Sequence, residues 1–124
     1  MKSILKANAL VVALALLISS QVLAQATNVT GEWTFNVTTD QGGGTPTLVF
    51  KQDGEKLTGK YNGTLGAADL TGTVKGNVIH FTFTVDAQGQ QAPVTYDGTV
   101  EKNTMKGTLN IAGAINGTFT GTKK

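Results

Sequence analysis

Apolar and polar residues alternate along most of the chain after residue 26. In the stretch VTGEWTFNV, residues 29–37, every second position is apolar or Gly and the positions between them are polar. A period of two is typical of a β-strand with one buried face and one solvated face. Segments of this kind predict eight strands, at 29–38, 46–52, 55–62, 67–75, 77–86, 92–101, 103–111 and 114–122.

The connections between these segments carry turn chemistry. Asp53-Gly54 and Gly76-Asn77 are typical of tight hairpins. Longer polar loops are expected at 40–46 and 86–93, with Pro46 and Pro93 near strand starts, where Pro is tolerated. Short sequential strands without helical periodicity predict an all-β fold, a small antiparallel up-and-down β-barrel.

A repeated glycine supports closure of the sheet. The pattern apolar-x-Gly-x-apolar occurs six times, always with Gly in phase with the apolar residues. A mid-strand Gly lets a strand bend sharply and leaves room for a neighbouring aromatic ring, so the repeat favours a sheet that coils and closes into a barrel. A solenoid is the competing interpretation of a repeat, but the irregular spacing disfavours it. The expected bends lie at Gly31, Gly59, Gly72, Gly98, Gly107 and Gly117.

All eight aromatic residues share the apolar phase, whereas the other phase is rich in Thr. Thr suits a solvated strand face, because it is β-branched yet polar. The aromatic face is therefore expected to be the core or a cavity wall. The aromatic residues are Trp33, Phe35, Phe50, Tyr61, Phe81, Phe83, Tyr96 and Phe119.

Residues 1–26 have the pattern of a secretory signal peptide: a basic start, an apolar run and small residues at cleavage spacing. An uncleaved membrane anchor is the alternative, but polar residues at 19–21 end the apolar run early. The expected product is one secreted or periplasmic domain, residues 27–124. The chain has no Cys, so neither a disulfide nor a lipidated cysteine is expected.

Charge and composition argue against several classes of function. Residues 27–124 contain eight Lys, no Arg and eight acidic residues, so their formal net charge is zero and nucleic-acid binding has no electrostatic footprint. Apart from Lys123 and Lys124 there is no basic patch for a membrane, and no membrane insertion is expected. Residues 27–124 contain no Ser or Cys that could serve as a nucleophile. Their one His, His80, lies on the outer phase. The acidic residues lie on the outer phase or in turns, so we expect no enzyme, no cofactor and no metal site.

Three inward residues have a polar group that could orient a ligand: Trp33, Tyr61 and Tyr96. They form the candidate site for a small apolar molecule in the barrel mouth. The alternative is that their rings only fill the core.

Gly31-Glu32-Trp33, in the first strand, resembles the Gly-x-Trp signature of lipocalins, avidins and their calycin relatives, and DGEKLTGKY is similar to a second-strand hairpin of avidin-like chains. The resemblance implies a barrel whose Trp packs at a closed end against a basic residue of the last strand, here Lys123. Biotin binding is not carried over, because avidins line their site with several Trp. The chain is also similar to compact Gly/Thr-rich barrel domains of uncharacterised secreted bacterial proteins, which implies a fold and no activity.

Four function classes follow, in order of preference. The first is a soluble barrel that binds a small apolar ligand. The second is a structural, interaction or accessory domain with a filled core. An outer-membrane barrel comes third, because the strands are short and form no aromatic girdles. An enzyme comes last, and the sequence leaves the oligomeric state open.

Overall fold

The computed structural model describes residues 27–87 and 89–124. The expected signal peptide, residues 1–26, lies outside the described residues. Among the described residues, no helix is long and apolar enough to cross a membrane.

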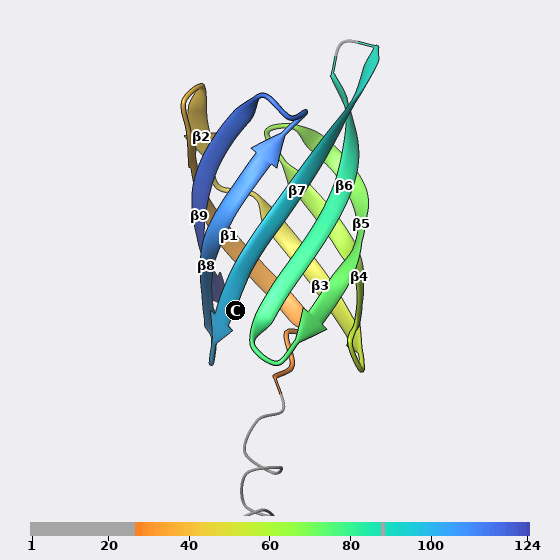
Figure 1. Cartoon of the computed structure of the whole chain (residues 1–124), viewed down its shortest axis with the longest axis vertical. Coiled ribbons are helices and arrows are strands. Elements are labelled where there is room, and N and C mark those ends of the chain that lie inside the picture. The colour runs from red at the N-terminus through yellow and green to blue at the C-terminus, as the bar shows by residue number, and fades with distance from the viewer. Residues whose placement is uncertain (1–26, 88) are drawn as a thin grey trace, which may run out of the picture.

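Nine strands in simple succession make up one antiparallel sheet (Figure 1). Eight of them lie within a few residues of the predicted segments, so the strand prediction is confirmed. The strands are β1 (Gly31–Thr39), β2 (Gly42–Gly44), β3 (Thr47–Asp53), β4 (Lys56–Gly63), β5 (Gly66–Lys75), β6 (Val78–Ala87), β7 (Gln90–Glu101), β8 (Thr104–Ile111) and β9 (Ile115–Lys123).

The sheet closes on itself, because β1 pairs with both β3 and β9. The predicted antiparallel up-and-down barrel is therefore confirmed. Closure is extensive, with seven register pairs from Trp33↔Lys123 to Thr39↔Gly117. A closed barrel leaves no long unpaired edge strand.

The short strand β2 was not expected, because the sequence predicts a polar loop over residues 40–46. In the structure, β2 pairs with the end of β1 through Val37↔Gly44, and β3 pairs with its start through Thr34↔Thr47. The register is unbroken between them, and the Phe35 N–H donates to the Pro46 carbonyl over 3.0 Å. Since Pro has no N–H of its own, the ladder is interrupted there. β2 and β3 are thus two parts of one barrel strand.

The inward face of the barrel is the hydrophobic core. All eight aromatic side chains lie inside, and none has more than 4% of its surface exposed. Their rings form a continuous cluster in which Phe35 contacts Phe50, Phe81, Tyr96 and Phe119. The predicted assignment of the two strand faces is therefore confirmed.

The repeated glycines lie where strands approach closely. A Cβ added to Gly72 would lie 1.9 Å from the His80 carbonyl oxygen and 2.7 Å from Cβ of Phe81. Phe81 is also the register partner of Gly72. The glycine thus lets an aromatic ring pack over bare backbone, as expected for a strongly coiled strand. Gly31 differs, because its φ of +135° is rarely adopted by L side chains.

Candidate ligand site at the open end of the barrel

The two ends of the barrel differ. At the lower end in Figure 1, residues 27–30 lead into the start of β1. Val29 is fully buried there, and the Trp33 indole N–H donates to its carbonyl oxygen over 2.9 Å. We call this the closed end. Trp33, which is itself fully buried, contacts the edge of Phe50 with ring centroids 6.4 Å apart.

One side chain, Gln52 of β3, fastens the closed end. Its Oε1 accepts a hydrogen bond from the Val29 N–H, and its Nε2 donates to the Thr27 carbonyl, each over 2.9 Å. The Gln52 N–H in turn donates to Oγ1 of Thr30 over 3.0 Å. Residues 27–30 are thereby tied to the neighbouring strand. This role was not predictable from the pattern of residues, because Gln52 is an ordinary polar residue before a turn.

Lys123 is the register partner of Trp33 across β1 and β9. Its Cε lies 2.9 Å from the position a Cβ on Gly31 would take, so the lysine stem crosses Gly31. The resemblance to calycins implied a basic residue of the last strand beside the Trp, and the structure places Lys123 there. Stacking of its ammonium on the indole stays a prediction.

The opposite end of the barrel holds an open cavity of about 230 Å³. It forms where β1, β2, β4, β7, β8 and β9 meet the turn between β4 and β5. Its lining is largely apolar and contains no charged side chain. The lining residues are Val37, Thr39, Gln41, Gly42, Gly43, Gly44, Pro46, Tyr61, Thr64, Leu65, Tyr96, Leu109, Ile111 and Ile115.

Tyr61 and Tyr96 supply the aromatic part of this lining. Tyr61 stacks on Phe83 with centroids 4.3 Å apart, and Tyr96 stacks on Phe81 at 4.8 Å. Both rings are buried almost completely. The core therefore holds the two tyrosines in place, which gives a preorganised wall for a ligand.

The tyrosine hydroxyls stay protonated. Burial raises the pKa of Tyr96, and the nearby Tyr61 raises it further. Burial also raises the pKa of Tyr61, although a hydrogen bond with the Leu65 backbone partly offsets this effect. Both groups are thus neutral at physiological pH and can donate a hydrogen bond.

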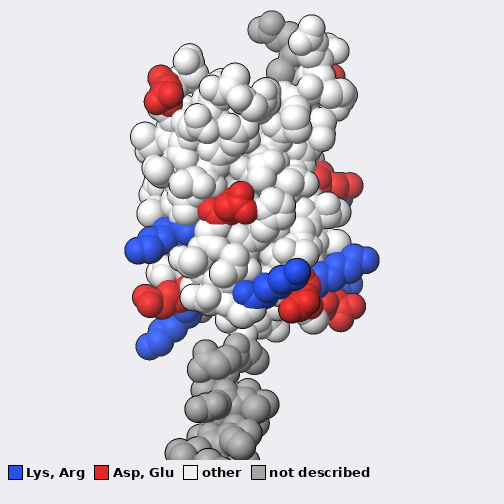
Figure 2. Space-filling model, in the orientation of Figure 1, with Lys and Arg blue, Asp and Glu red and all other residues white. Residues whose placement is uncertain are grey.

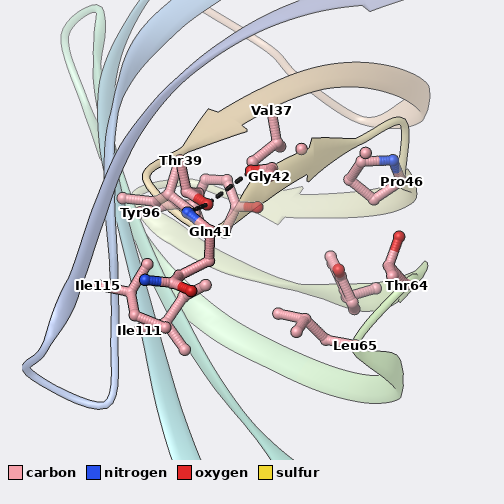
Figure 3. Close-up of a pocket in the computed structure, with 14 residues that line it drawn as sticks. Val37, Thr39, Gln41, Gly42, Pro46, Thr64, Leu65, Tyr96, Ile111 and Ile115 are labelled. Carbon is pink, nitrogen blue, oxygen red and sulfur yellow. Dashed lines mark hydrogen bonds between the residues drawn. The ribbon is translucent and has the colours of Figure 1, made fainter.

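The rim of the cavity is built by the tight turn from β1 to β2. The Thr39 hydroxyl donates to the Gly42 carbonyl over 2.6 Å and accepts from the Gln41 N–H at 3.1 Å. This turn directs the Gln41 side chain across the mouth toward Ile111 and Ile115 (Figure 3). Gln41 is exposed, so it can move aside at little cost.

The structure brings together two of the three residues predicted as a site. Tyr61 and Tyr96 line the same cavity, whereas Trp33 lies at the closed end and does not line it. Sequence reasoning missed the aliphatic walls, Val37, Leu109 and Ile115, which read only as core positions. It also missed the glycine run of β2, which was interpreted as a loop.

In the described part of the chain, the acidic residues and His80 lie on the outer surface or in turns, and none of them lines the cavity. All eight acidic residues are exposed. His80 lies on the outer surface, where its Nδ1 is 2.6 Å from Oδ1 of Asp97. Both side chains are about half exposed. No group of three or more His, Cys, Asp or Glu residues that could hold a metal ion occurs among the described residues.

No protein-family model matches this chain, and no curated protein matches it. Solved structures do match it in fold. A redesigned β-barrel, b11L5F_LGL, superposes with a TM-score of 0.65 at 17% sequence identity, covering 77% of this chain and 91% of the design. A second redesigned β-barrel, mFAP1 bound to DFHBI, gives a TM-score of 0.60 at 16% identity, covering 77% of this chain and 94% of the design. At these identities the likeness shows the fold alone: the chain is an eight-stranded antiparallel β-barrel similar to these designs.

Proposed function

We propose that this protein is a soluble, secreted or periplasmic, non-enzymatic barrel that binds a small, largely apolar molecule in its open mouth. The observation that carries the proposal is the cavity of about 230 Å³ with its uncharged, largely apolar wall and two buried tyrosines. Ligand sites are typically concave and apolar, with a few polar groups that fix orientation.

The size of the cavity limits the ligand. A cavity of about 150 Å³ is known to hold benzene. The cavity in this barrel, at about 230 Å³, therefore suits a molecule of one or two rings. A barrel of similar fold, mFAP1, carries DFHBI, so the architecture is compatible with a small-molecule site.

The orientation of the strand faces supports a soluble role. The apolar face lies inside, whereas the outward positions carry mostly Thr, Lys and acidic residues. A membrane barrel has the opposite arrangement, with an apolar band toward lipid. The polar groups of the cavity wall are hydroxyls, one amide and backbone, which can orient a ligand. No carboxylate or imidazole lines it to move a proton.

The second candidate is an interaction domain that binds no small molecule. The tight aromatic cluster favours it, because the same rings that face the cavity also complete the core. Under this alternative the mouth would hold only water, and the outer surface would carry the function.

Native mass spectrometry separates the two candidates. The processed protein, purified without detergent from its own host, is expected to carry a bound small molecule. As a defined probe, 2-naphthol should shift NMR resonances of Leu109 and Ile115 and leave those of Trp33 unchanged.

A matched pair of variants sharpens the test. Ile115→Trp fills the cavity and should abolish naphthol binding, whereas Asn116→Trp adds the same ring on the exposed side of β9 and should not. Absence of any co-purifying molecule, together with no probe-induced shift at the mouth, would rule out the binding role.

A further inference from the structure

Charge is distributed unevenly along the barrel axis. Of the eight lysines in residues 27–124, seven lie near the closed end, within or close to its turns or at the end of β9: Lys51, Lys56, Lys75, Lys102, Lys106, Lys123 and Lys124. On the face in Figure 2, the lysines lie in the lower half of the molecule. The remaining one, Lys60, sits further along β4, where its Nζ lies 2.7 Å from Oδ1 of Asp69.

At the mouth, Lys60 directly precedes the lining residue Tyr61, but its exposed ammonium is paired with Asp69, whereas two acidic residues near the mouth have no lysine partner among the described ion pairs. Asp40 lies in the turn from β1 to β2, directly before Gln41, and Asp86 lies near the end of β6. Exposed charges further away than about 8–10 Å are largely screened at physiological ionic strength. The lysines of the closed end therefore contribute little potential at the mouth, where the lining has no charged side chain and Asp40 directly precedes the lining residue Gln41.

Among the hydrogen-bond donors of the described residues that line the cavity, the Tyr96 hydroxyl is the one carried by an almost fully buried ring without a protein partner. Among the described residues no hydrogen bond engages the Tyr96 hydroxyl, and no buried polar side-chain atom is left unsatisfied. The hydroxyl is thus accessible from the cavity that Tyr96 lines. A ligand with an acceptor atom in reach would complete this hydrogen bond.

We propose that the mouth binds neutral or cationic molecules of one or two rings in preference to anions, and that the Tyr96 hydroxyl donates a hydrogen bond to a neutral ligand that carries an acceptor. This inference rests on the proposed binding function. An anion would leave water for a wall without a cation, next to Asp40, and the transfer of an unpaired charge into apolar surroundings is costly.

Three probes with the same bicyclic ring test the discrimination. At neutral pH 2-naphthol is neutral, 2-naphthylmethylamine is cationic and 2-naphthoate is anionic. Calorimetric titration of the processed protein at low salt should give the tightest binding for the neutral probe and about tenfold weaker binding for the anion. The cation should bind at least about threefold more tightly than the anion, and added salt should reduce that difference in affinity.

A charge placed on the rim tests the cause. Gln41→Lys introduces an ammonium on a side chain that crosses the mouth, and it should strengthen 2-naphthoate binding about tenfold (Figure 3). Thr38→Lys, on the exposed face of β1 three residues before Gln41, is the matched control with the same change in net charge and should leave the anion's affinity within about twofold.

The donor is tested by Tyr96→Phe, which removes only the hydroxyl. It should weaken 2-naphthol about three- to tenfold, the range for one neutral hydrogen bond, and leave 2-methylnaphthalene unaffected.

The outcomes separate three claims: the charge selectivity, the donor role of Tyr96 and the binding function. If 2-naphthoate binds at the mouth as well as 2-naphthol, or if Thr38→Lys acts like Gln41→Lys, the charge selectivity is wrong and the binding function stands. If Tyr96→Phe weakens both uncharged probes equally, the donor role is wrong. If no probe shifts resonances at the mouth, the binding function fails, and the selectivity fails with it.

Discussion

Replacing Gly72 by Ala adds one methyl group at the closest approach of two strands. A Cβ at this position would lie 1.9 Å from the His80 carbonyl oxygen and 2.6 Å from Cα of Phe81. These are backbone atoms of the paired strand β6, so no change of rotamer can relieve the contact. The strands themselves have to separate.

The size of that separation sets the cost. Close C–H···O contacts in sheets have C···O distances of about 3.3 Å, so β5 and β6 would have to part by about 1.4 Å near Gly72. Such an opening weakens two or so ladder hydrogen bonds, each contributing about 0.5–1.5 kcal/mol net. It also displaces Phe81, which is fully buried and stacks on Tyr96. We expect Gly72→Ala to lower the free energy of unfolding by about 3 kcal/mol, at the upper end of typical overpacking costs.

Urea denaturation followed by Trp33 fluorescence measures this loss, because Trp33 is the sole tryptophan and is fully buried. Since 1 kcal/mol shifts the Tm of a domain of this size by about 4–8 °C, the Tm should fall by about 12–24 °C. Thr71→Ala, at the neighbouring exposed position, is the control and should change stability by less than about 1 kcal/mol. Equal denaturation midpoints for the two variants would refute the close-approach argument.

Three further predictions address the closed end and the tyrosines. Trp33→Ala should cost about 3–5 kcal/mol, as expected for a large buried side chain, and native Trp33 emission should be blue-shifted and resist iodide; red-shifted, readily quenched emission would contradict its burial. Gln52→Ala removes the hydrogen bonds to Thr27 and Val29 and should lower the free energy of unfolding by about 1–3 kcal/mol, with loss of hydrogen-exchange protection at the Val29 amide. Unchanged protection would show that residues 27–30 are held in place without Gln52. Burial raises the pKa of both tyrosines above the ordinary 10.0, so the folded state holds these protons more tightly than the unfolded state, and their contribution to stability is complete below about pH 10 and is lost as the pH rises beyond it. Absorbance at 295 nm should therefore show tyrosinate only as the protein unfolds, and ionisation near pH 10 with the fold intact would be the contrary result.

Much of the fold follows from local rules that the sequence carries. Alternation with a period of two assigns each side chain to one face of a strand, because covalent geometry turns successive side chains to opposite sides. Phe35 and Phe81 could therefore be placed inside, and His80 outside, before any strand was paired. The turn residues Gly54 and Gly76 marked two of the hairpins, and both have positive φ in the structure.

The strand pairing of β2 was not predictable in the same way. Its three glycines have no side chains and so show no alternation. They pair with β1 because Pro46 and Thr47 have already fixed the register in which the chain runs alongside that strand. The non-local partner, and not the local composition, decided this element.

The sequence determined which residues face inward, but only the tertiary structure decided at which height along the barrel each one lies. Trp33 and Tyr61 share the inner phase, yet one seals the closed end and the other lines the mouth. Height depends on the stagger between neighbouring strands, which accumulates around the closed sheet and is set jointly by all its registers. The cavity therefore unites Val37, Tyr96 and Ile115, from three strands far apart in the chain, because closure through β1 and β9 brings those heights together.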